Sequence, residues 1–228
     1  MPTIVWDFDY TLFDAAAFKD DLKRAVVRQG VTPERFDQAY RQVVKRQGKT
    51  YDYDPVEHLR LLAEDLGSVE AAEAARRGIQ AVLSDTRRYL YPDAEAILGR
   101  LKEAGARQLL LTLGNKDWQS QKVANAGLEP YFDRIVPFDG DKAEMLGRLA
   151  EMEGELVVVN DNGREVKSMR DRWPELKYIL VAGPKETPEG LELIPAKGLL
   201  EAERMIGLTA PPKEGDEARL SEGTAARH

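Results

Sequence analysis

The fold is decided by the stretch Thr3-Ile4-Val5-Trp6-Asp7-Phe8-Asp9-Tyr10-Thr11-Leu12-Phe13-Asp14. Its first four residues are rich in β-branched and aromatic side chains, which predicts a short buried strand. Two carboxylates, Asp7 and Asp9, follow directly. Carboxylates are costly to bury without a compensating partner, and in an open α/β sheet ligands bind at the carboxyl ends of strands. The stretch therefore predicts a site for a divalent cation, or for a reacting phosphate with its metal.

The composition excludes several classes of protein. The 228 residues, 43% hydrophobic and 32% charged, suffice for one large domain or a domain with a smaller insert. No apolar run is long enough for a membrane span, and no signal segment precedes the first strand, so we expect a cytoplasmic protein without a membrane partner. The absence of Cys excludes disulfides and thiolate chemistry. A formal net charge of -7 argues against a nucleic-acid partner. The oligomeric state is not indicated.

Histidine chemistry has little room in this sequence. Only His58 and His228 are present, and there is no Gly-x-Ser-x-Gly turn for a serine nucleophile. His58 lies beside an apolar helical stripe, where a surface or core role is typical. Acid–base and nucleophilic work therefore falls to carboxylates, Lys or Tyr, which is compatible with an Asp nucleophile that forms an acyl phosphate.

Residues 14–90 are predicted to be helical throughout. Apolar spacing, capping residues and glycine stops predict helices at Ala15 to Gln29, Thr32 to Gly48, Asp54 to Gly67 and Ser68 to about Leu83. The loop from Lys49 to Asp54 is polar and aromatic. Its Tyr rings either pack on neighbours or face a substrate.

Strands and helices alternate after Tyr91-Pro92. Strands are predicted at 107–112, near 135, at 155–159 and at 177–181, with 191–194 as a short edge strand. The pattern predicts an α/β fold with a doubly wound, mostly parallel Rossmann-like sheet and an inserted all-helical cap. We expect residues 1–14 and 90–208 to form the core domain and 15–89 the cap domain. Residues 209–228 are a polar, charged tail that we expect to be disordered.

Polar residues follow three of the later predicted strands. Thr112 ends the second, and a helix starting near Lys116 would direct its N-terminus at a phosphate. Lys142 lies at a helix start, where the helix dipole does not favour it; it is either solvated or used for binding. Asp161 and Glu165 form a second acidic turn after a buried strand. Hard oxygen ligands without His or Cys suit Mg²⁺.

These motifs, in this order, resemble those of the haloacid dehalogenase-like (HAD) hydrolases. Asp7-x-Asp9-x-Thr11 resembles the first motif, Thr112 the second, Lys142 the third and Asp161 with Glu165 the fourth, while Lys116 and Lys122 are alternatives for the third. The stretch Gly-Leu-x-x-Tyr-Phe-Asp-x-Ile-Val at 127–136 resembles the same place in C1-capped phosphatases. The sequence departs from the family pattern at Tyr10, Leu113, Asn160 and Glu165.

The resemblance implies a Mg²⁺-dependent phosphatase that hydrolyses a small phosphorylated metabolite through an aspartyl phosphate. It assigns Asp7 as nucleophile, Asp9 as acid and then base, and Lys142 as the charge-neutralising lysine. The implied substrate-binding residues are Thr11, Thr112 and Leu113, and the implied Mg²⁺ ligands are Asp7, Asp9 through its carbonyl, Asp161 and Glu165. Two alternatives stay open: a phosphonatase or mutase on the same scaffold, or a non-catalytic protein that binds a phosphate ligand.

Overall fold

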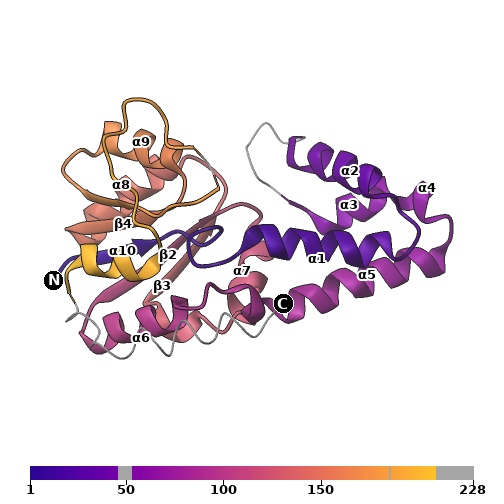
Figure 1. Ribbon diagram of the computed structural model, residues 1–228, viewed down its shortest axis with the longest axis horizontal. Coiled ribbons are helices and arrows are strands. Elements are labelled where there is room, and N and C mark those ends of the chain that lie inside the picture. Colours follow the sequence, from indigo (N-terminus) through magenta and orange to yellow (C-terminus); the bar gives the residue numbers. More distant parts are fainter. Residues whose placement is uncertain (46–52, 185, 209–228) are drawn as a thin grey trace.

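A single parallel sheet organises the computed structural model, which describes residues 1–45, 53–184 and 186–208 (Figure 1). Its strands are β1 (Thr3–Trp6), β2 (Arg107–Leu113), β3 (Arg134–Phe138), β4 (Leu156–Asn160) and β5 (Lys177–Leu180). Their order is β3-β2-β1-β4-β5, and every pairing is parallel. The chain therefore moves outward from β1 on one side and then on the other, so β1 and β4 flank a switch point where α/β sheets bind ligands. The predicted doubly wound α/β fold is confirmed.

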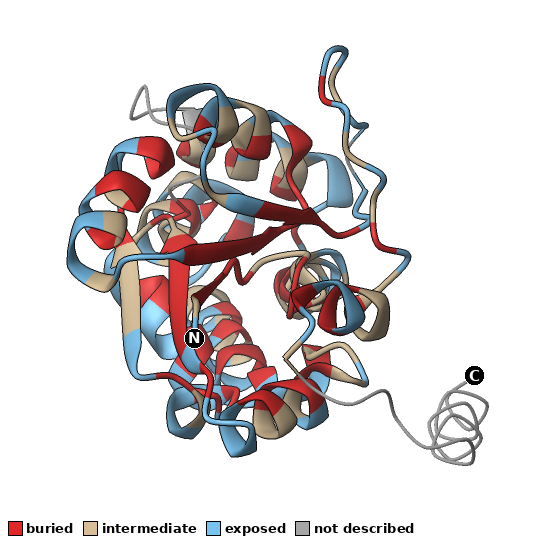
Figure 2. Cartoon of the chain, turned by 90° about the vertical axis from the view of Figure 1, so that its left-hand side faces the viewer, coloured by how far each residue is buried: buried red, intermediate tan, exposed pale blue. Residues whose placement is uncertain are grey.

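Helices cover both faces of this sheet. Alternate residues of β1 point to opposite faces: Ile4 and Trp6 join one apolar cluster, and Val5 joins the other. One face packs against α8 (Lys142–Glu153) and α9 (Gly163–Arg172), and the other against α6 (Ala94–Glu103), α7 (Lys116–Asn125) and α10 (Leu199–Ile206). A short 3-10 turn, η2 (Glu129–Tyr131), precedes β3. The central strands β1 and β4 are buried between these layers, whereas the edge strand β3 is mostly of intermediate exposure (Figure 2).

The segment between β1 and β2 is helical, as predicted, and its long helices lie beside the sheet (Figure 1). It contains α1 (Ala15–Val27), α2 (Pro33–Lys45), α3 (Pro55–Leu61), α4 (Ala63–Leu66), α5 (Val69–Ser84) and the 3-10 turn η1 (Thr86–Tyr89). The side chains of Asp14 and Ser68 cap α1 and α5 by accepting backbone N–H bonds. Phe13 stacks on Phe8 at 4.8 Å and meets Phe18 of α1 edge-on at 5.3 Å, so aromatic packing joins this block to the sheet. The domain boundaries stay a prediction.

Two local predictions were wrong. The expected third helix divides at Leu62, which leaves the helical conformation (φ −97°, ψ 1°) between α3 and α4. Residues 191–194 form no strand, because Leu193 N–H donates to the Leu191 carbonyl in a tight turn. Instead Ala196 bonds beside β5, with its N–H on the Leu180 carbonyl at 2.8 Å.

Some predictions cannot be compared with the structure. The predicted tail at 209–228 and residues 49–52 of the aromatic loop lie outside the described residues. Within the part that is described, none of the helices has the length and apolar character that a membrane span requires.

His58 gives the fold a predicted sensitivity to acid. Its ring is fully buried, with Nδ1 3.0 Å from the Tyr53 hydroxyl and Nε2 3.2 Å from the Phe36 carbonyl. Burial lowers the pKa of His58 to about 4, from 6.5 in an exposed residue. As the pH falls, His58 takes up a proton in the unfolded chain before it does so in the folded protein. The contribution of neutral His58 to the free energy of unfolding is therefore fully present above pH 6.5 and is lost as the pH falls towards 4, by about 3 kcal/mol at most.

Urea titrations followed by circular dichroism at pH 7 and at pH 4.5 measure this loss. We expect His58→Gln to lose less stability than the wild type between these two pH values, because glutamine does not titrate. An equal loss in both proteins would show that His58 does not cause the acid sensitivity.

Candidate active site

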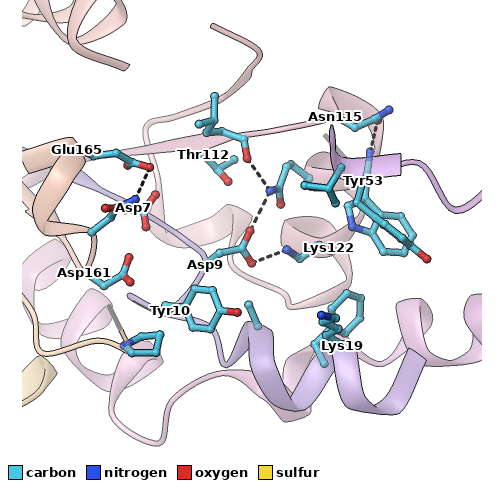
Figure 3. A pocket seen from close by; sticks show the side chains of 18 of the residues that line it. Asp7, Asp9, Tyr10, Lys19, Tyr53, Thr112, Asn115, Lys122, Asp161 and Glu165 are labelled. Carbon is cyan, nitrogen blue, oxygen red and sulfur yellow. Dashed lines mark hydrogen bonds and ion pairs between the residues drawn. The ribbon is translucent and has the colours of Figure 1, made fainter. Parts of the chain in front are cut away.

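The carboxyl ends of β1, β2 and β4 open into one cavity of about 430 Å³, which residues of α1 and α2 line on its other side (Figure 3). Of the predicted site residues, the structure brings together Asp7, Asp9, Thr112, Leu113, Lys142, Asp161 and Glu165 along its wall. Thr11 is the exception: it is fully buried behind the wall. Residues more than 150 positions apart in the sequence therefore share one small space.

Thr11 joins the two acidic turns. Its hydroxyl donates to Asp7 Oδ2 at 3.1 Å and accepts the backbone N–H of Asp161 at 3.0 Å. β1 and β4 are neighbours in the sheet, so the turns that follow them are adjacent. The sequence predicted Thr11 as a substrate-binding residue, but the contacts described give it a different position, as a bridge that fixes the Asp161 backbone beside Asp7.

Lys142 is the lysine beside Asp7. Its buried Nζ lies 2.5 Å from Asp7 Oδ1 and 2.8 Å from Glu165 Oε2. Burial alone would lower the pKa of Lys142, but the two carboxylates outweigh burial and raise that pKa above its ordinary value. Lys142 is thus held in its charged form next to Asp7 at neutral pH. Lys116, an alternative considered from the sequence, is 61% exposed and lies 3.7 Å from Asp139.

Glu165 is held by neighbours that occupy both of its oxygens. Oε2 accepts from Lys142 and from Asn160 Nδ2 at 3.1 Å, and Oε1 accepts from Asn162 Nδ2 at 2.8 Å. Asn160, which departs from the family pattern, therefore has a role in orienting Glu165. Asn162 was not singled out from the sequence. Glu165 acts on Asp7 through Lys142, since both carboxylates share that ammonium.

The Asp9 carboxylate is held by a hydrogen bond and an ion pair from two residues of α7. Gln119 Nε2 donates to Asp9 Oδ2 at 2.9 Å, and Lys122 Nζ lies 2.5 Å from Asp9 Oδ1. The Lys122 side chain is 4% exposed, and its ammonium lies 4.9 Å from the centre of the Phe13 ring. The aromatic faces and the carboxylate offset the cost of burying this charge.

The contacts of Gln119 and Lys122 with Asp9 were not predicted from the sequence. Lys122 was considered there only as an alternative to Lys142, and Gln119 was not considered. The available signal was their spacing, because residues three apart lie on one face of a helix.

Tyr10, one of the departures from the family pattern, lies in a left-handed turn. It has φ +66°, the left-handed conformation that costs a non-glycine residue about 1–2 kcal/mol. Its N–H donates to the Phe13 carbonyl at 2.7 Å, and the Phe8 carbonyl accepts the N–H groups of the next residues. The hydrogen bonds of the turn therefore hold Tyr10 in this conformation.

The residues present are compatible with a hard divalent cation. Asp7 and Asp161 offer carboxylate oxygens to the same cavity, and such ligands suit Mg²⁺. Gly183 makes room beside Asp161, because a Cβ at this position would lie 2.8 Å from Asp161 Oδ2. No cluster of three or more His, Asp or Glu side chains in a metal-holding arrangement occurs among the described residues. The expected Mg²⁺ ligand set therefore stays a prediction.

Comparison with known proteins agrees with this geometry. The model of the haloacid dehalogenase-like hydrolase family matches residues 1–170. The chain belongs to this family, and it is a hydrolase of the HAD type.

Individual relatives are more distant or match only in part. Over 67 residues the chain is 40% identical to a phosphoserine phosphatase of Thermus thermophilus, a match that covers 29% of this chain and 27% of that protein. A HAD-like hydrolase of Burkholderia xenovorans is similar in structure, with a TM-score of 0.73 at 20% identity over 91% of this chain and 98% of that one. A 2-haloacid dehalogenase of Pseudomonas syringae has a TM-score of 0.63 at 18% identity over 91% and 98%. Both structures are similar in fold alone.

Proposed function

We propose that this protein is a Mg²⁺-dependent phosphatase that hydrolyses a small phosphorylated metabolite of the cytoplasm through an aspartyl phosphate on Asp7. The observation that carries the proposal is the second carboxylate. Asp9 lines the same cavity as Asp7 and is held by Gln119 and Lys122, so the site has an acid–base group beside its nucleophile. The partial match to a phosphoserine phosphatase supports the same class of reaction.

In the first step an Asp7 oxygen forms a bond to phosphorus while the bond from phosphorus to the alcohol oxygen breaks. Asp9 donates a proton to the departing oxygen. In the second step Asp9 removes a proton from water, whose oxygen attacks phosphorus and releases Asp7 and inorganic phosphate. Lys142 and the Thr112 hydroxyl bind the phosphoryl oxygens. When bound, Mg²⁺ would be held by Asp7 and Asp161 and would offset the negative charge of the phosphoryl group.

The main alternatives within the family differ in what they require. A haloacid dehalogenase releases a halide ion, which needs no proton, so Asp9 would have no leaving group to protonate. A phosphonatase or a mutase needs additional groups from the helical block. A binding protein would retain ligand affinity without turnover.

A substrate panel separates the phosphatase from a dehalogenase, a phosphonatase and a binding protein. We expect the purified protein to release phosphate from p-nitrophenyl phosphate with Mg²⁺, to lose activity with a chelator and to regain it when Mg²⁺ is restored. No halide release from 2-chloropropionate and no phosphate release from phosphonoacetaldehyde are expected. Halide release, phosphonate cleavage, or the absence of turnover on every phosphate ester would contradict the proposal.

A further inference from the structure

The cavity has two chemically different ends. Figure 3 shows Asp7, Asp161 and Glu165 at one end and Lys19 and Tyr53 at the other, with the Asp9–Lys122 pair between them. The proposed function accounts for the first end, where a phosphoryl group binds. It leaves the second end, which the leaving group would occupy, without an assigned ligand.

Aromatic and apolar side chains dominate the second end. The ring of Tyr53 lies 5.2 Å from that of Trp118 and 5.0 Å from that of Tyr40, and Trp118 lies 5.8 Å from Phe18. Leu22 and Val44 complete this part of the wall. Phe18 belongs to α1, Tyr40 to α2 and Trp118 to α7, and Tyr53 lies just before α3. The rings therefore line the cavity from several directions. Such walls bind flat apolar rings through face and edge contacts.

One cation is placed among these rings. Lys19 lines the cavity, and its ammonium lies 4.2 Å from the centre of the Tyr40 ring. Across the described residues no Asp or Glu forms an ion pair with Lys19. Lys23, one turn later on α1, lies instead 2.7 Å from Asp37. Asp37 acts on Lys19 electrostatically, but from beyond ion-pair distance. A lysine that lines a ligand cavity and has no direct carboxylate partner among these residues can serve an anionic group on the ligand.

We propose that the substrate is the phosphate ester of an aromatic alcohol that carries a second negative charge, such as a carboxylate, at the end of the ring away from the phosphate. The ring packs against the wall that Tyr53, Trp118 and Phe18 form together, and the second charge binds Lys19. This proposal rests on the proposed function for the phosphoryl end. It assigns Lys19 as a residue that determines specificity.

Two esters of matched shape test the role of charge. These are 4-carboxyphenyl phosphate and 4-carbamoylphenyl phosphate, which differ in the charge of one substituent, and glycerol phosphate tests the need for the ring. We expect the wild type to prefer the carboxylate over the amide by about tenfold in kcat/KM, a typical size for one part-buried charge pair. Glycerol phosphate should be the poorest of the three.

Lys19→Met should remove the preference and leave the amide ester within about threefold of its wild-type kcat/KM. Lys116→Met, which changes an exposed lysine that does not line the cavity, should keep the wild-type preference. Equal losses on both aryl esters in Lys19→Met, or a preference for glycerol phosphate in the wild type, would overturn the proposal.

A binding measurement separates this inference from the proposed function. In Asp7→Asn protein with Mg²⁺, calorimetry with 4-carboxyphenyl phosphate is expected to show binding that Lys19→Met weakens about tenfold. If no ester is hydrolysed and this difference is still found, the proposed function fails and the ligand assignment stands. If esters are hydrolysed but Lys19→Met binds equally well, the ligand assignment fails alone.

Discussion

Asp7→Asn is expected to lower kcat for phosphate release on the order of 10⁴-fold or more, because an amide cannot act as the nucleophile in acyl-phosphate formation. The fold should survive this change. Lys142 retains Glu165 as a carboxylate partner at 2.8 Å, so removing the Asp7 charge does not leave the buried ammonium unpaired. Steady-state release of phosphate from p-nitrophenyl phosphate measures the loss, and circular dichroism checks the fold.

Glu165→Gln is the matched comparison, since it also removes one carboxylate from Lys142. Because Glu165 acts on Asp7 through Lys142, we expect a loss of tenfold to 100-fold, far smaller than that of Asp7→Asn. An Asp7→Asn protein with near-wild-type kcat would exclude Asp7 as the nucleophile.

Lys122→Met is expected to slow only those steps that use Asp9. Met fills similar volume among the phenylalanine rings but removes the ammonium that grips the carboxylate at 2.5 Å. p-Nitrophenolate leaves without a proton, so the first step should stay fast in this variant. We therefore expect a rapid burst of about one equivalent of p-nitrophenolate per enzyme molecule, followed by slow turnover that is limited by hydrolysis of the aspartyl phosphate. For an alkyl phosphate, which needs the proton, we expect no burst and a loss of about 100-fold in kcat. Stopped-flow absorbance measures the burst of p-nitrophenolate, and phosphate release measures turnover of the alkyl phosphate.

Lys116→Met is the control on the same helix. Lys116 is 61% exposed and does not line the cavity, so we expect wild-type kinetics with both substrates. If Lys122→Met showed no burst of p-nitrophenolate and also a low steady-state rate, Lys122 would be needed for the structure as a whole and not for Asp9 in particular.

The sheet was predictable because its signals are local and consistent. Each strand is an apolar run bounded by turn residues, and burial on both faces makes such runs continuous. The segment 191–194 has the same apolar character, yet it forms no strand. Apolar character alone does not distinguish an edge strand from a loop that packs its leucines on the surface of a helix layer. The division of the third helix at Leu62 could not be predicted from the sequence either, because no Gly or Pro lies at this position.

The site was predictable where a single turn of chain carries several polar groups, as at Asp7 to Thr11 and at Asp161 to Glu165. It was not predictable where the contact crosses the fold. Lys122 reaches Asp9 from a helix that starts more than 100 residues later, and Gly183 is notable only once Asp161 lies against it. Lys19 likewise looks like a solvated helix residue until Tyr40 packs beneath it.

The most direct test of an aspartyl phosphate on Asp7 is to identify the phosphorylated residue. In Asp9→Asn protein, p-nitrophenyl phosphate can still phosphorylate Asp7, but water is no longer activated, so the acyl phosphate should accumulate. Borohydride reduces an aspartyl phosphate to homoserine, which peptide mass spectrometry locates. We predict homoserine at position 7 only after substrate is added, and none in the Asp7→Asn, Asp9→Asn double variant. Reduction at another residue, or none while nitrophenolate is released in a burst, would contradict an aspartyl phosphate on Asp7.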